Sequence, residues 1–203
     1  MNYRNIVAPY LNNIAIEEKV ELFRKEFWNN NIPVEIEDII ELKLDISIIP
    51  VPNFLKLANM DALITSTFKY IYVDNNEYLN ESRYNRLRFS LAHEIGHFIL
   101  HREIYYNFDI KNQDDYRKLY RDISELQYGY LEIQANKFAS YLLIPRKVLA
   151  IEMEKKLENS KNSLSRFKKM DRKVLNSYLA IPLSKIFQVS EEAMKYALED
   201  INL

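Results

Sequence analysis

Cysteine is absent from this 203-residue chain, and glycine occurs only twice, as Gly96 and Gly129. The first absence excludes disulfides and thiolate metal sites, and it fits a reducing cytoplasm, where we expect the protein to act. The scarcity of glycine excludes the glycine-rich phosphate loops of nucleotide-binding proteins. No apolar run approaches the roughly 18 residues of a membrane-spanning helix, so we expect neither a membrane nor a nucleotide as a partner.

Net charge is also nearly absent. The 28 Lys and Arg residues stand against 29 Asp and Glu residues, which gives a formal charge of −1. The molecule as a whole therefore has no electrostatic attraction to nucleic acid or to anionic lipid. The exception is local, since residues 155–173 carry eight basic and two acidic side chains, a charge of +6. We interpret this stretch as a solvated linker, and contact with DNA is the alternative.

Hydrophobic spacing divides the chain into three parts, namely residues 1–30, 31–150 and 151–203. The first part is predicted to be helical, and the last to be a basic linker followed by further helices. The central part mixes segments typical of strands with two long helical patterns, so we expect an α+β fold. Its predicted elements are a short helix near 35–44, strands within 45–52 and 61–74, a helix at about 82–101, a polar connector at 102–125 and a helix at 130–145.

All three histidines of the chain lie in a span of nine residues inside one apolar stretch, 88–101. They are His93, His97 and His101. On a helix they share a face with Glu94, because residues three, four and seven apart are neighbours. Burial of a polar group without a partner costs about 2 kcal/mol or more. The stripe must therefore face a cavity, a partner or a metal ion, and a pair of hydrogen-bonded core histidines is the alternative.

His93 and His97 are one helical turn apart, so both imidazoles can reach one cation at about 2.0–2.1 Å. Glu94 lies on the same face and can take a proton from an attacking water and pass it to a leaving amine. The segment HEIGH thus has the form H-E-x-x-H, the helix motif of zinc peptidases.

A catalytic zinc ion usually has three protein ligands, and this chain has no fourth histidine. His101 is a poor third ligand because it lies about 6 Å further along the helix axis than His97, and we expect it to end the helix or to bond a ligand. A carboxylate on the next helix is better placed, and Glu132 is favoured over Glu125, which lies in a more polar stretch. Asn136 follows one turn later, where its oxygen can accept the Nδ1–H of a ligating histidine.

The segments RLRFSLAHEIGHFILH and EIQANKFASYLLIP together resemble the ImmA/IrrE family of zinc metallopeptidases, over about residues 30–150. The family pattern has R-F-T-x-A-H-E-[LI]-G-H followed by E-x-x-A-N-x-F-A-x-x-L-L-x-P. The resemblance implies a zincin-like, gluzincin-like domain at 31–150, with a small antiparallel or mixed sheet packed on the H-E-x-x-H helix. Ser90 departs from the pattern, since threonine is common at this position.

Carried over by position, the resemblance implies His93, His97 and Glu132 as Zn²⁺ ligands and Glu94 as the catalytic residue. It also implies a cytoplasmic site-specific endopeptidase whose substrate is a helix-turn-helix transcriptional repressor, so that cleavage derepresses genes. The alternative is a non-proteolytic zinc-bound regulator that binds a repressor or, through its C-terminal helices, DNA. The tail resembles a helix-turn-helix in outline, with Gln188 where glycine is usual, but we expect these helices to pack on the domain.

Three further expectations concern the substrate. Tyr84, Arg88 and Tyr130 are candidates for stabilising the oxyanion, and their chemistry alone does not choose among them. The substrate is expected to lie extended along an edge strand, for which residues 69–74 are the candidate. The connector after the H-E-x-x-H helix is long enough to form a lid or a specificity surface.

Overall fold

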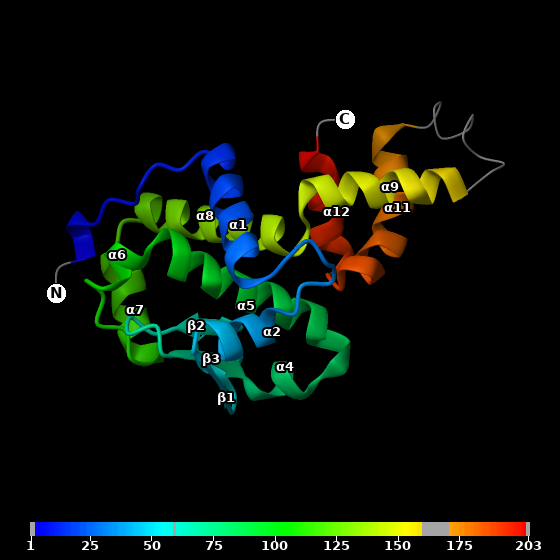
Figure 1. Cartoon of the computed structure of the whole chain (residues 1–203). Helices are drawn as coiled ribbons and strands as arrows, with labels where there is room; N and C mark the ends of the chain where they lie inside the picture. Colours follow the sequence, from blue (N-terminus) through cyan, green and yellow to red (C-terminus); the bar gives the residue numbers. More distant parts are fainter. Residues whose placement is uncertain (1–2, 59, 160–170, 202–203) are drawn as a thin grey trace.

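The computed structural model describes residues 3–58, 60–159 and 171–201 (Figure 1). In this part of the chain helices dominate and the strands are short. The strands are β1 (Ser47–Val51), β2 (Ala62–Ile64) and β3 (Tyr70–Asp74). The helical elements are η1 (Tyr3–Asn5), α1 (Asn13–Phe27), α2 (Ile36–Asp38), η2 (Ile39–Lys43), α3 (Phe54–Ala58), α4 (Asn75–Leu79), η3 (Glu81–Arg83), α5 (Tyr84–Leu100), α6 (Arg102–Tyr105), α7 (Gln113–Asp122), α8 (Glu125–Leu143), α9 (Arg146–Asn159), α11 (Arg172–Phe187) and α12 (Glu191–Asp200).

The strands form one mixed sheet in the order β1-β3-β2. β1 runs parallel to β3, and β2 pairs antiparallel with β3 on its other side. The expectation that residues 69–74 form an edge strand is therefore wrong, because β3 is central. Its buried residues Ile71 and Val73 are two positions apart, so they share the face of the strand that packs in the core. The short strand β2 is the edge beside α5.

Helix α5 lies between the sheet and α8 (Figure 1). Its residues Leu91, Ala92 and Ile95 are fully buried, which explains why this helix reads as apolar in the sequence. The approach of α5 to α8 depends on Gly96, because a Cβ at that position would lie 3.0 Å from both the Cα and the carbonyl oxygen of Ala135. The absence of a side chain thus sets the distance between the two helices.

One helix boundary and one connector differ from the sequence prediction. Helix α8 begins at Glu125 rather than near residue 130, because the side chain of Ser124 caps its first turn. Gly129 lies inside this helix, in open surroundings where an added Cβ would meet nothing within 4 Å. The polar connector at 102–125 contains α6 and α7, and Asn112 caps the second of these. Caps thus extend helices into segments whose hydrophobic pattern is weak.

The C-terminal helices lie with α9 at one end of the molecule (Figure 1). Between α11 and α12, Gln188 has the left-handed backbone conformation usually taken by glycine (φ 50°, ψ 54°). Its side chain accepts a hydrogen bond from the buried Arg88 at 3.0 Å. This contact fixes the turn against α5. Most of the basic stretch 155–173 lies outside the described residues.

The architecture is α+β, as predicted, and is consistent with a zincin-like fold. Among the described helices, none has both the length and the apolar character needed to cross a membrane. The division of the chain at residues 30 and 150 stays a prediction.

Candidate metal centre

The three residues predicted as metal ligands come together between α5 and α8. The Nε2 atoms of His93 and His97 lie 3.0 Å apart. The two carboxylate oxygens of Glu132 lie 3.3 Å from Nε2 of His93 and 3.5 Å from Nε2 of His97. Two consecutive turns of α5 and one residue of α8 thus direct ligand atoms at a single point. These three residues form a group that could hold a metal ion.

The spacing of these atoms fits a small divalent cation. Ligand atoms about 2.0–2.1 Å from a tetrahedral ion lie roughly 3.3–3.4 Å from one another. The two Nε2 atoms are 3.0 Å apart, and each lies 3.3 or 3.5 Å from a different oxygen of Glu132, which is close to that value. Two imidazoles and a carboxylate are also a donor set of catalytic zinc. The geometry therefore supports the predicted ligand set, while the ligand roles themselves stay a prediction.

A chain of hydrogen bonds determines which nitrogen of His97 faces this point. The side-chain Nε2 of Gln134 donates to the carbonyl of Pro9 at 2.7 Å, and that carbonyl can only accept. The Oε1 atom of Gln134 therefore faces His101, whose Nε2–H must donate to it at 2.9 Å. His101 Nδ1 then accepts from His97 Nδ1–H at 3.0 Å. The remaining nitrogen of His97, Nε2, carries a lone pair directed at the candidate metal position.

His101 is suited to this chain because it stays neutral. Burial, with a smaller contribution from His97, lowers the pKa of His101 to about 3. A protonated His101 would have no lone pair for the Nδ1–H of its neighbour. His101 ends α5 and contacts His97, both as expected, while the role of His97 as a metal ligand stays a prediction.

His93 has a simpler arrangement. Its Nδ1 lies 2.9 Å from Oδ1 of Asn136, the contact predicted from the sequence. Burial by itself lowers the pKa of His93, but the hydrogen bond to Glu132 and the charges of Glu94 and Glu132 raise it to about 9. Burial likewise raises the pKa of Glu132, but its hydrogen bonds to His93 and His97 hold that pKa well below the usual value. Without a cation, a proton on His93 neutralises the cluster, and a bound cation would replace it.

Glu94 lies beside the cluster and is oriented by the sheet. The backbone N–H of Ile64 in β2 donates to its Oε2 at 2.7 Å. Burial raises the pKa of the Glu94 carboxyl group, although His93 and His97 act in the opposite direction. A raised pKa suits a group that must accept and then release a proton near neutral pH.

These groups line a cavity of about 630 Å³ between β2, α5, α7 and α8. The connector after α5 contributes one wall, and its role as a specificity surface stays a prediction. Four tyrosines from the connector and the start of α8 line the cavity, namely Tyr105, Tyr116, Tyr120 and Tyr128. The hydroxyls of Tyr116 and Tyr128 are 2.6 Å apart, and burial raises the pKa of both, so they remain neutral donors.

The oxyanion candidates taken from the sequence do not line this cavity. The hydroxyl of Tyr84 donates to Glu37 at 2.8 Å, and Arg88 is buried toward Val34 and the α11–α12 turn. Tyr130 lies on an exposed part of α8. The hydrophobic pattern could not reveal the directions of Tyr84 and Arg88, because they depend on contacts distant in the sequence.

Comparison with known families agrees with this geometry. A family model of peptidases, the IrrE N-terminal-like domain, matches residues 53–199. The chain belongs to this family. A search of curated proteins finds no significant match. The family match and the candidate metal-binding group together support a metallopeptidase-type function. The match extends into α12, beyond the residues on which the sequence resemblance depended.

Gln134 is the most informative residue that the sequence analysis missed. It lies among the apolar residues Leu131, Ala135 and Phe138 of α8 and is buried. A polar side chain on the apolar face of a helix indicates a buried hydrogen-bond partner. That signal was present in the sequence, although the identity of the partner was not.

Proposed function

We propose that this chain is a zinc-dependent endopeptidase that cleaves a specific protein. The convergence of His93, His97 and Glu132, with Glu94 beside them, is the observation that carries the proposal. These three residues would hold the ion. When bound, zinc would act as a Lewis acid toward the scissile carbonyl. It would also lower the pKa of water, so that a hydroxide nucleophile is available near neutral pH.

The chain's own groups supply the remaining chemistry. Glu94, fixed by the N–H of Ile64, accepts the proton of the attacking water and delivers it to the leaving amine. Asn136 and His101 hold the two imidazoles in the tautomer that leaves Nε2 unprotonated. Among the groups that line the cavity, the tyrosine hydroxyls and the guanidinium of Arg117 can donate to the developing oxyanion.

The substrate is best accommodated along β2. Thr65 N–H donates to Tyr70 and Asp74 N–H donates to Asp61, so residues 61 and 65 direct their backbone groups toward β3. By the alternation of an antiparallel ladder, Ala62 directs its backbone groups away from β3. Ala62 also lines the cavity, where an extended peptide can pair with it as an added strand.

A helix-turn-helix transcriptional repressor is the proposed substrate, as the family resemblance implies, and its cleavage would derepress genes in the cytoplasm. Contact of α12 with DNA is disfavoured by charge, whereas α11 carries three basic residues and no acidic one. Helix α12 carries four acidic residues and one basic residue, Lys195, and such a helix repels phosphate.

Cleavage is tested with the zinc-loaded chain, a proteome-derived peptide library and any helix-turn-helix repressor encoded beside the gene. New termini are identified by mass spectrometry. We expect cleavage by the wild type, and none by Glu94→Gln or in the presence of a chelator. Identical termini from the wild type and Glu94→Gln would contradict the proposal. A repressor that is retained by the zinc-loaded chain but left intact would support the non-proteolytic regulator instead.

A further inference from the structure

A second cavity, of about 740 Å³, lies between the first half of α5, α8 and α12. Four of the residues that line it also line the candidate metal cavity, namely Asp61, Phe89, Ser90 and Asn136. One of them, Asn136, also bonds His93. The two cavities thus adjoin each other along shared residues, and together they extend past the candidate metal centre from the tyrosine wall to the C-terminal helix.

The distal part of this cleft, between α8 and α12, is apolar and open. Ile133 of α8 is 60% exposed and Tyr196 of α12 is 65% exposed, and both line it together with Phe89 and Ala193. Large apolar side chains at such exposure are individually common on protein surfaces. Their position on the two walls of a cleft that leads to the candidate metal centre is what distinguishes them.

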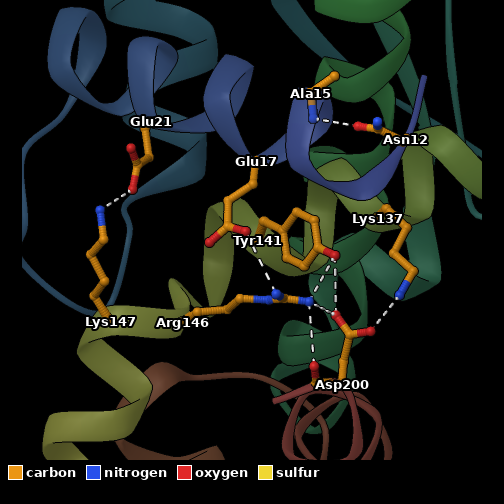
Figure 2. A network of polar contacts seen from close by, with 9 residues as sticks. All are labelled: Asn12, Ala15, Glu17, Glu21, Lys137, Tyr141, Arg146, Lys147 and Asp200. Atoms are coloured by element: carbon orange, nitrogen blue, oxygen red, sulfur yellow. Dashed lines mark hydrogen bonds and ion pairs between the residues drawn. The ribbon is translucent and has the colours of Figure 1, made fainter. Parts of the chain in front are cut away.

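The wall formed by α12 is held in place by a polar network (Figure 2). Lys137 and Tyr141 of α8 contact the carboxylate of Asp200 at 3.0 and 3.1 Å, and Arg146 forms an ion pair with the same group. Arg146 also pairs with Glu17 of α1 at 3.6 Å. The end of α12 is therefore tied to α8 and α1, and the cleft is preformed rather than assembled by its occupant.

The charges of the cleft indicate what else its occupant carries. Asp61 pairs with Arg86 at 2.8 Å, and Lys137 is paired with Asp200. Glu192 lines the cleft and has no ion pair within the described ranges of the chain. The side chains of this region thus offer apolar walls and one unpaired carboxylate.

We propose that the cleft between α8 and α12 is the continuation of the substrate-binding site. It holds an extended segment of the protein substrate on one side of the scissile bond, with an apolar or aromatic side chain against Ile133 and Tyr196 and a basic side chain at Glu192. The inference rests on the proposed endopeptidase function and assigns part of its specificity to the C-terminal helix.

The test uses the full zinc-loaded chain and a proteome-derived peptide library. The wild type should prefer apolar and basic residues on one side of the cleaved bond. Tyr196→Ala should lower kcat/KM for peptides with the apolar residue by about 10-fold, and Glu192→Gln should remove the preference for a basic residue. Tyr178→Ala, at an exposed position of α11, and Glu191→Gln, whose carboxylate pairs with Lys195 outside the cleft, are the matched controls.

A binding measurement separates this inference from the proposed function. Peptides displayed on phage are selected on the zinc-loaded Glu94→Gln chain, with and without the added change Tyr196→Ala. Enrichment of apolar and basic residues that depends on Tyr196 supports the cleft even if no peptide is cut, in which case only the hydrolytic function fails. Cleavage or selection with preferences that Tyr196→Ala and Glu192→Gln leave unchanged overturns the cleft and leaves the peptidase intact. An absence of both cleavage and selection overturns both.

A second copy of this chain is the other candidate occupant. If it filled the cleft, sedimentation would show a dimer at high concentration that Tyr196→Ala dissociates. That result would overturn the assignment of the cleft to substrate. A monomer at all concentrations, together with Tyr196-dependent peptide selection, supports it.

Discussion

The two candidate histidine ligands are held in different ways, although they lie one turn apart on the same helix. The side chain of His97 is 4% exposed and begins a buried chain of hydrogen bonds that ends at the carbonyl of Pro9. The side chain of His93 is 14% exposed, and its Nδ1 bonds Asn136, an exposed residue that lines the cleft. One ligand is thus fixed by the protein interior and the other by a residue at the surface where the substrate is proposed to pass.

The difference indicates a division of roles. Hydrogen-bond partners of metal ligands fix the tautomer and the orientation of the imidazole ring. On the buried side, loss of a partner leaves polar groups that water cannot reach, whereas on the open side water can replace the partner. The buried side, which comprises His97 and its hydrogen-bonded chain, should therefore contribute more of the metal affinity. The open side, which comprises His93 and Asn136, should couple metal binding to substrate binding. Four substitutions test this comparison.

The largest effect is expected from Glu132→Gln, because Glu132 is shared by both sides. An amide lacks the negative charge and offers only one oxygen, so we expect zinc affinity to fall by more than about 100-fold, beyond the loss typical of outer partners. Competition with a chromophoric chelator measures it. Glu125→Gln, on the same helix at an exposed position, should leave the affinity unchanged. An equal loss in both variants would show that Glu132 is not the third ligand.

The second effect concerns the spacing of α5 and α8, on which both sides depend. Gly96→Ala places a Cβ 3.0 Å from the backbone of Ala135, so we expect a loss of stability of about 1–3 kcal/mol and weaker zinc binding. Gly129→Ala is the control, since it meets nothing within 4 Å and should stabilise the helix by about 0.5–1 kcal/mol. Thermal unfolding and the chelator assay give both values. A neutral Gly96→Ala variant would mean that the helices can separate without loss.

These two glycines also show how far the sequence predicts the structure. The helices, the α+β class and the contact of Asn136 with His93 follow from local spacing and from motif geometry. The role of Gly96 does not, because it depends on the residue of α8 that α5 happens to meet. The edge position of β2 and the ending of the His97 chain at Pro9 depend likewise on pairing between segments far apart in the sequence. Local patterns fix which groups are present, and the tertiary arrangement decides which of them meet.

The third effect tests the buried side directly. Gln134→Leu removes the acceptor of His101 and the donor to Pro9, and we expect zinc affinity to fall by about 10–100-fold. Gln134→Glu keeps an oxygen for the Nε2–H of His101 but loses the donor to Pro9. It should therefore retain more zinc affinity than the leucine variant. If the two variants bind zinc equally weakly, the link to His101 does not orient the ligand and the buried chain serves packing alone.

The smallest effect is expected on the open side. Asn136→Ala removes the only side-chain partner that the described residues provide to Nδ1 of His93, but the position is exposed and water can accept the same N–H. We expect a loss of zinc affinity of less than about 10-fold, smaller than that of Gln134→Leu. Because Asn136 also lines both cavities, its loss should change peptide selection more than it changes metal binding. The chelator assay and the peptide profile, measured on one preparation, compare the two. A loss of zinc affinity equal to that of Gln134→Leu would mean that the surface partner orients its ligand as strongly as the buried chain does, and the division between the two sides would not hold.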